Sequence, residues 1–276
     1  MHINRKKIII NEINAKHALG ISGMKELDYT LNPYLGCLHG CLYCYAIGMN
    51  PKNIAGDWGN VLYVRKNITE ILQMEAKKYK KGIVGISSIT DPYNPVEGKY
   101  RLTRNSIEIL AKNNFYVTLQ TKSPIALRDI DIIKKYRNII DIGYTITTMD
   151  EKIKDMIEPY SPSVRSRMRA LKKFSENGIK TWIFIGPIIK NINDNLNDIY
   201  NIIEFASKIK SRIIYDKYVN YPGPGKYMEN INYGISDSAW WNDMELKING
   251  MCHDLNVICT SEQADWLYER GQKTLF

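Results

Sequence analysis

The chain has 276 residues, 44% of them hydrophobic, with a net charge of +9 at pH 7 and five cysteines. That length suits two small domains or one α/β barrel. No run of about 18 apolar residues predicts a membrane-spanning helix, and residues 1–10 lack the apolar core of a secretory signal. We therefore expect a cytoplasmic protein. The charge favours polyanionic partners such as DNA or RNA, although biased codon usage would also produce lysines spread along the chain.

Short apolar runs alternate with amphipathic stretches, which is typical of βα units and a parallel sheet. The expected strands are Ile83–Ile89, Phe115–Gln120, Ile139–Thr147, Lys180–Ile189, Arg212–Val219 and Asn256–Thr260. The expected helices are Asn67–Lys80, Thr103–Asn113, Ser163–Asn177, Asp194–Lys210 and Ser236–Leu255. Thr103 is expected to cap its helix at the N-terminus, and Gly178 is expected to end the helix before it.

With one further strand before residue 37, these elements make about six βα units. The fold prediction is therefore α/β, a partial (β/α)6 TIM-like barrel. We expect an N-terminal extension at residues 1–29, a barrel core at 30–220 and a C-terminal helical and loop extension at 221–276. Trp240 and Trp241 in that extension are expected to close the open side of the barrel, or to stack on bases. In barrels the chemistry gathers at the C-terminal ends of the strands.

Cys37, Cys41 and Cys44 are spaced C-x3-C-x2-C. Three thiolates on one tight loop can hold three irons of a cubane [4Fe–4S] cluster and leave the fourth iron open to a small molecule. A structural zinc site needs four closed ligands, and His39, between two of the cysteines, could not easily complete the same tetrahedron.

The chain's other cysteines, Cys252 and Cys259, lie more than 200 residues from this loop. They are too distant in sequence to suggest the fourth ligand of a ferredoxin cluster. A disulfide framework is not expected in a long, lysine-rich chain without a secretory signal.

The loop and its flanks, Asn32–Ala46, resemble the signature of the radical S-adenosylmethionine (SAM) superfamily. Segments within 87–104, 121–130 and 158–194 resemble its spore photoproduct lyase-like (DNA-repair-photolyase-like) branch, so the likeness covers roughly residues 30–220. The resemblance implies a [4Fe–4S] cluster on the three cysteines and cleavage of SAM to a 5′-deoxyadenosyl radical. It also implies an external electron donor such as a flavodoxin or a ferredoxin.

Four residues are expected to seat the SAM molecule. Ser88 and Lys122 follow successive strands, where they are placed to bind the SAM carboxylate, and they match a serine and a lysine used in spore photoproduct lyase. Tyr43 and the Ile188 region are expected to hold adenine. The alternative is that Lys122 is an ordinary solvated charge at a strand end.

Polar residues near the later strand ends complete the expected site. Thr145 or Thr147 could reach the SAM amino group or ribose, or could be ordinary strand residues. Asp91 beside a Pro-rich turn could orient substrate or bind the SAM cation, or cap a helix. Glu158 and Arg167 are expected to form an ion pair at the site, as the superfamily uses such residues.

The expected substrate is related to nucleic acid, as in the spore photoproduct lyase-like proteins. That enzyme splits a thymine dimer with a cysteine as hydrogen donor near the end of its second strand, where this chain has Ser87-Ser88. Replacement donors would be Cys259, Cys252, Tyr215, Tyr218 or Tyr221. Buried cysteines are commonly packing residues, and a chain with 19 tyrosines singles out none of them.

Two other functions stay open from the sequence. The same radical chemistry could act on a small molecule or a peptide, or the chain could be a non-catalytic metal-binding module. The last residues, Gln272–Phe276, look like the Gln-x-x-Leu-Phe peptides that dock on sliding clamps, and a tail packing on its own domain is the alternative.

Overall fold

The computed structural model describes residues 5–221 and 223–261, which contain two β-sheets. The smaller sheet consists of β1 (Ile9–Ile13), β5 (Val61–Arg65) and β4 (Tyr34–Leu35), in that order. The larger sheet consists, in spatial order, of β11 (Cys259–Thr260), β10 (Arg212–Lys217), β9 (Lys180–Ile188), β8 (Ile140–Thr145), β7 (Tyr116–Thr121), β6 (Ile83–Ile86), β3 (Tyr29–Leu31) and β2 (Leu19–Ile21).

The strands of the larger sheet are parallel from β3 through β11, and β2 is antiparallel to β3. The expected α/β class is confirmed, and the strand predicted before the cysteine loop is β3. The sheet is mixed and does not close on itself, because the antiparallel β2 forms one edge and β11 forms the other. Residues expected as an N-terminal extension form β1 and β2 and so take part in both sheets.

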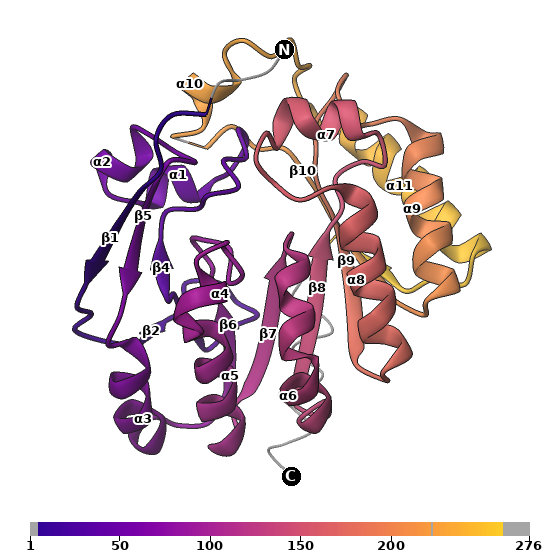
Figure 1. The fold of residues 1–276 in the computed structure, drawn as a ribbon. Helices are drawn as coiled ribbons and strands as arrows, with labels where there is room; N and C mark the ends of the chain where they lie inside the picture. Colours follow the sequence, from indigo (N-terminus) through magenta and orange to yellow (C-terminus); the bar gives the residue numbers. More distant parts are fainter. Residues whose placement is uncertain (1–4, 222, 262–276) are drawn as a thin grey trace.

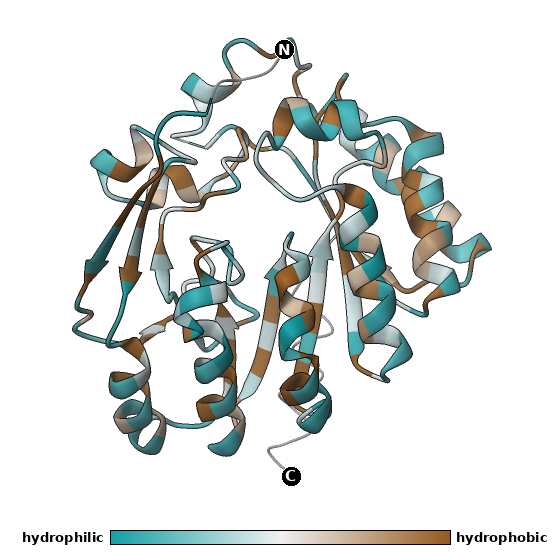
Figure 2. Ribbon diagram, viewed as in Figure 1, coloured by the Kyte–Doolittle hydropathy of each residue, from teal (hydrophilic) through white to brown (hydrophobic). Residues whose placement is uncertain are grey.

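Helices lie along the outer side of the strands, which run in an arc (Figure 1). The longer helices are α3 (Ile68–Lys78), α5 (Leu102–Lys112), α8 (Val164–Glu176), α9 (Leu196–Lys208) and α11 (Ser238–Asp254). The short ones are α1 (Ala46–Met49), α2 (Lys52–Ala55), α4 (Glu97–Tyr100), α6 (Ile130–Lys135), α7 (Glu151–Ile157), α10 (Gly225–Met228) and the 3₁₀ turn Pro124–Asp129. Hydrophobic and polar residues alternate along these helices (Figure 2), as expected of helices with one packed face. In the described part of the chain no helix is long and apolar enough to cross a membrane.

The two faces of the larger sheet differ in chemistry because successive side chains of a strand point to opposite sides. On β8, Ile142 belongs to the core that packs against the helices, whereas Asp141 and Gly143 lie on the other face, here called the inner face. There Trp182 donates its indole N–H to the Asp141 carboxylate at 2.8 Å. A Cβ on Gly143 would lie 2.2 Å from the Trp182 ring, so the glycine lets the indole lie flat across the strand.

The N-terminal end of α5 differs from the prediction. Thr103 lies inside the helix, and Arg101, in the left-handed region at φ 53°, precedes the first helical residue. The Glu97 carboxylate accepts the backbone N–H groups of Thr103 and Arg104 at 3.1 and 3.3 Å, so it satisfies the donors that a capping threonine would have served. At α8 the prediction is confirmed, since Ser163 is the N-cap and Gly178 follows the helix with φ 70°.

The C-terminal part of the described chain extends the larger sheet. After β10 the chain crosses to α2, where the Tyr227 hydroxyl donates to the Ala55 carbonyl at 2.8 Å, and then returns through α11 to β11. Trp241 packs in the helix-side core, 6.0 Å from the Tyr215 ring. The expectation that Trp240 and Trp241 close an open side is therefore wrong, because α11 joins the outer helical layer beside α9 (Figure 1).

Candidate cofactor site

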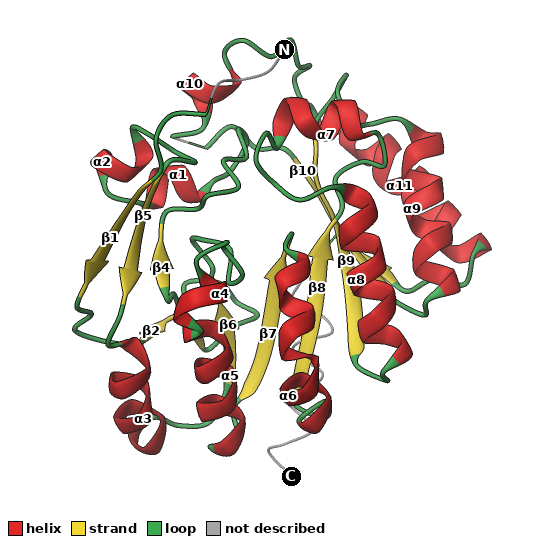
Figure 3. Cartoon of the chain, viewed as in Figure 1, coloured by secondary structure: helices red, strands yellow, loops and turns green. Residues whose placement is uncertain are grey.

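The three cysteines lie on the loop between β4 and α1 (Figure 3). All three are free thiols, and Cys37 and Cys41 are buried. Burial raises the pKa of each, that of Cys41 to about 12, and the Lys122 charge opposes this rise at Cys41 and Cys44. Thiolates at this place therefore need a cationic partner, and an iron–sulfur cluster supplies one.

The described residues do not form a site for a single metal ion. Within residues 5–221 and 223–261, no three His, Cys, Asp or Glu side chains converge on one metal position. A structural zinc site needs all its ligands on one ion, whereas the irons of a cubane take one thiolate each.

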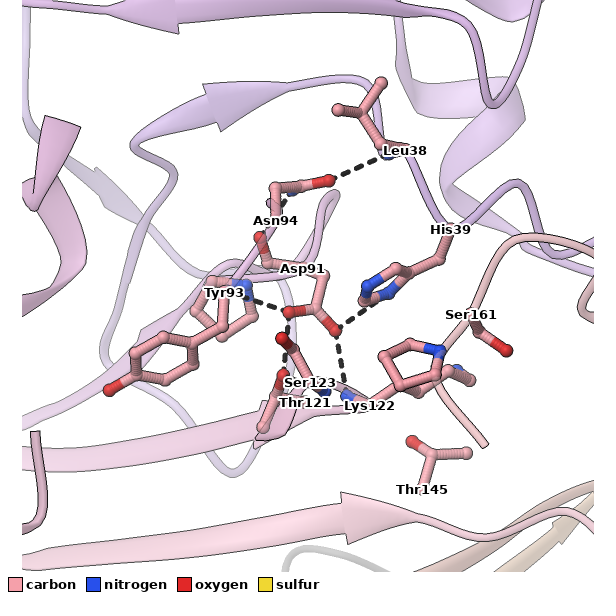
Figure 4. A network of polar contacts seen from close by, with 12 residues as sticks. Leu38, His39, Asp91, Tyr93, Asn94, Thr121, Lys122, Ser123, Thr145 and Ser161 are labelled. Atoms are coloured by element: carbon pink, nitrogen blue, oxygen red, sulfur yellow. Dashed lines mark hydrogen bonds and ion pairs between the residues drawn. The ribbon is translucent and has the colours of Figure 1, made fainter. Parts of the chain in front are cut away.

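Asp91, in the loop after β6, ties the cysteine loop to the end of β7 (Figure 4). Its carboxylate accepts the Thr121 hydroxyl at 2.7 Å and the Lys122 backbone N–H at 2.9 Å, and it lies 3.3 Å from the His39 ring. Next to it, Asn94 accepts the Leu38 backbone N–H at 2.8 Å. Two residues of the cysteine loop are thus held by side chains of the neighbouring loop.

The same contacts define the role of Asp91. Its side chain is buried, and the Tyr93 backbone N–H adds a further hydrogen bond at 2.8 Å. Burial raises the pKa of this carboxyl, but His39 and the hydrogen bonds from Lys122 and Thr121 outweigh it, so the pKa lies below its usual value. Asp91 fixes the loop as an ionised anchor, and with its carboxylate occupied the expectation that it binds substrate or the SAM cation is not supported.

Glu158 and Arg167 form the expected ion pair, with both side chains fully buried. Arg167 also donates to the Thr145 carbonyl at 3.0 Å, and the Glu158 carboxylate accepts the hydroxyls of Tyr43 and, at 3.0 Å, Thr147. Burial raises the pKa of Glu158, yet the Arg167 and Lys122 charges bring it down to about 2. The pair joins the residue before the third cysteine to the end of β8.

This network locates both threonines of the expected site. The Thr147 hydroxyl is directed to Glu158, whereas the Thr145 hydroxyl accepts a hydrogen bond from Gln120 at 3.0 Å. Tyr43 is buried, and its hydroxyl also donates a hydrogen bond to Glu158.

Ser88 and Lys122 follow β6 and β7 and lie next to the cysteine loop. The Lys122 ammonium stands 5.6 Å from the Tyr43 ring centre. Burial lowers the pKa of Lys122, but Cys41 and Glu158 raise it more, so the side chain is cationic. The Ser88 hydroxyl accepts from Asn32 at 3.3 Å. Lys122 thus lies near Tyr43 of the cysteine loop, and the Ser88 backbone carbonyl accepts the Tyr45 hydroxyl at the end of that loop.

Other expected residues lie on the helix side of the sheet. Ile188 is fully buried in the helix-side core, although its neighbour Ile189 belongs to the apolar cluster that contains Cys41 and Tyr43. Tyr215 donates to Asn249 of α11 at 2.9 Å, in the same outer layer.

The two distant cysteines are paired as a disulfide, Cys252–Cys259, which is a single link and not the disulfide framework that the sequence argues against. Cys252 is buried in the helix-side core. Disulfide sulfurs carry no hydrogen, so neither residue is placed to serve as a donor here. Of the expected donors, Tyr218 shares an apolar cluster with Cys41 and Tyr43.

Ser87 is a residue that the sequence reasoning set aside. It directly follows β6, with φ 73°, and its buried hydroxyl has no hydrogen-bond partner. A left-handed serine with an unpaired buried hydroxyl is strained, and such strain gathers at functional sites. No sequence signal marked it, because Ser87 falls inside the expected strand Ile83–Ile89, whereas β6 ends at Ile86.

Known proteins resemble the chain along most of its length. An uncharacterized protein of Methanocaldococcus jannaschii is 38% identical over 188 residues, which cover 68% of this chain and 71% of that protein. An uncharacterized protein of Acidianus two-tailed virus is 27% identical over 80% of this chain and 75% of its own length. The Radical SAM Nalpha-GlyT isomerase of Pseudomonas phage M6 is 23% identical over 68% of this chain and 38% of its own length.

Solved structures share the fold. Spore photoproduct lyase complexed with dinucleoside spore photoproduct superposes with a TM-score of 0.71 at 11% identity, covering 91% of this chain and 81% of that one. Streptococcus suis SuiB bound to S-adenosylmethionine gives 0.63 at 18% identity, over 90% of this chain and 52% of that one. Residues 31–206 match the Radical SAM superfamily. The chain therefore belongs to this superfamily of enzymes, which use a [4Fe–4S] cluster and SAM and need an electron donor.

Proposed function

We propose that Cys37, Cys41 and Cys44 hold the [4Fe–4S] cluster and that the enzyme acts on a nucleobase of a nucleic acid. The observation that carries the first part is the set of free cysteines on one loop, anchored by Asp91 and by Glu158. When bound, the cluster supplies the electron that cleaves SAM to a 5′-deoxyadenosyl radical.

The residues of this chain bind and orient the cofactor. Lys122, cationic and beside the loop, is placed to pair with the SAM carboxylate, and Ser88 at the end of β6 is placed to donate a second hydrogen bond. The Glu158–Arg167 pair holds Tyr43 and the end of β8 in position. Tyr218 stays the candidate hydrogen donor, since it lies on the cysteine side of the fold.

Two observations support a nucleobase as the substrate. A solved structure with this fold contains dinucleoside spore photoproduct, and the net charge of +9 suits a polyanion. We propose a reaction that uses no protein thiol, because the three loop cysteines are assigned to the cluster and the other two are paired with each other. We therefore propose chemistry on a single base in place of dimer splitting with a cysteine donor.

The experiment is anaerobic reconstitution, reduction and incubation with SAM, with and without oligonucleotide. Formation of 5′-deoxyadenosine that rises with a nucleic acid supports the proposal. No 5′-deoxyadenosine under any condition would count against radical chemistry. Formation that no oligonucleotide stimulates, together with no binding at low salt, would exclude the nucleic-acid substrate and favour a small molecule or a peptide.

A further inference from the structure

Two exposed tyrosines lie against each other next to the candidate cofactor site. Tyr45, directly after the third cysteine, is 40% exposed, and Tyr221, in the segment that follows β10, is 51% exposed. Their ring centres are 6.4 Å apart and their planes meet at 62°. We call this pair the rim tyrosines. Exposed aromatic pairs are uncommon on a surface without a partner, because their burial stabilises a protein.

Tyr45 is fixed at one end and open along its ring. Its hydroxyl donates to the backbone carbonyl of Ser88, which follows β6. The residue is 40% exposed while its hydroxyl is occupied by this hydrogen bond. The ring therefore stands beside the strand end that the proposed cofactor site uses.

Tyr221 comes shortly before a stretch that packs against α1 and α2. Gly223, with φ 120°, lies so close to α1 that a Cβ on it would stand 2.6 Å from the Gly48 nitrogen. Farther along, Tyr227 donates to Ala55 of α2 and accepts the Trp58 backbone N–H at 3.0 Å. Residues 223–227 are thus attached to α1 and α2, close in sequence to Tyr221.

The elements that carry or adjoin the rim tyrosines also expose apolar and basic side chains, while Glu26 acts on Tyr45 from the other direction. Met49, at the end of α1, is 63% exposed. Lys52 of α2 and Lys226 of α10 are exposed on the two elements that Tyr227 joins. Aromatic rings interleaved with lysines form the usual surface for a single-stranded nucleic acid, since the bases stack while the cations meet phosphates.

We propose that the rim tyrosines stack a base of a single-stranded nucleic acid and so bring the adjoining nucleotide to the strand ends at Ser88 and Lys122. This inference rests on the proposed function and names the form of its substrate. A small molecule would instead be enclosed in a concave pocket, and a duplex would keep its bases stacked on one another.

The test measures anaerobic binding of fluorescein-labelled single strands to the reconstituted full-length enzyme, by anisotropy across a salt series. Stacking of one base on an aromatic side chain corresponds to a loss of roughly 5- to 150-fold in affinity on removal of the ring. We expect that loss for Tyr221→Ala and near wild-type affinity for Tyr221→Trp, which keeps an aromatic face. Tyr200→Ala is the matched control, because Tyr200 is 41% exposed but lies on α9 in the outer layer.

The outcomes separate the two proposals. Equal binding by wild type and Tyr221→Ala, with unchanged iron content and circular dichroism, would overturn the stacking platform and leave the nucleic-acid substrate standing. If wild type binds no single strand while it still cleaves SAM, the platform and the substrate class both fail but the radical chemistry does not. Preference for duplex over single strand would also contradict the platform. Loss of affinity in Tyr221→Trp equal to that in Tyr221→Ala would mean that the site needs tyrosine itself, not a stacking face.

Discussion

Glu158 and Arg167 pair in an environment that excludes water completely, and the same carboxylate receives the hydroxyl of Tyr43, the residue before Cys44. One buried charge pair therefore connects the cysteine loop with α8 and the end of β8. Five experiments test this pair, the cysteines and the residues that follow β6 and β7.

Removal of one partner of the pair leaves the other charge buried and uncompensated. We expect Arg167→Met to lower the free energy of unfolding by about 3–5 kcal/mol, measured by denaturant titration. The double variant Glu158→Gln/Arg167→Met should lose less than the sum of the two single variants, because neither charge then remains. Lys112→Met is the control: its pair with Glu108 is exposed, so its change should stay within about 1 kcal/mol. Equal losses of unfolding free energy in Arg167→Met and Lys112→Met would contradict a buried charge pair at Glu158 and Arg167.

The pH dependence of stability follows from the pKa of Glu158. This pKa is about 2 in the folded chain, against 4.5 for an ordinary glutamate side chain. Because the folded-state value is the lower one, ionised Glu158 stabilises the fold above pH 4.5, and the contribution is lost as the pH falls toward 2. The difference corresponds to about 3 kcal/mol. The unfolding free energy of wild type should therefore fall more steeply between pH 5 and 2 than that of Glu158→Gln, and parallel curves would refute it.

The cysteines of the loop and those of the outer layer should behave differently. Cys41→Ala should bind less iron and form no 5′-deoxyadenosine, because one iron loses its thiolate. Cys252→Ala should keep both the iron content and the cleavage, since Cys252 packs in the helix-side core. Iron analysis and product chromatography report the two results, and retention of the cluster by Cys41→Ala would show that the site is elsewhere.

Lys122 is tested by its effect on SAM binding. Lys122→Met should weaken SAM binding by about tenfold or more through loss of a charge-assisted hydrogen bond, as measured by equilibrium dialysis at unchanged iron content. Lys99→Met, which replaces an exposed lysine on α4, should not change the affinity.

Ser87→Gly should raise the free energy of unfolding by about 1 kcal/mol, because glycine accepts a positive φ and removes the unpaired hydroxyl. If Ser87 also serves the reaction, the same variant loses cleavage activity as it gains stability. Ser87→Gly with lower stability than wild type would mean that the hydroxyl has a partner in solution.

The sequence predicted the elements whose cause is local. Apolar runs located β6 to β10 within a few residues, and Ser163 and Gly178 marked the ends of α8. The C-x3-C-x2-C spacing predicted the loop because its ligands are neighbours in the chain.

Features with distant partners could not be predicted in this way. β1 pairs with β5 about fifty residues later, and the donors at the start of α5 are satisfied by Glu97 instead of Thr103. From the sequence, Asp91 is predicted to lie beside a turn. Its anchoring role is not visible there, because its partners Thr121 and Lys122 belong to the next βα unit. The helical pattern around Trp241 is the same whichever surface the helix covers.

The cysteine loop is closely packed against the rest of the protein. Gly40 and Gly59 approach so tightly that a Cβ on Gly59 would stand 3.0 Å from the Gly40 Cα, and the Tyr160 ring lies against both. Asp91 and Glu158 hold the other sides of the loop. A side chain larger than hydrogen at Gly40 would therefore displace the loop, so a substitution there should lower the iron content although it removes no thiolate.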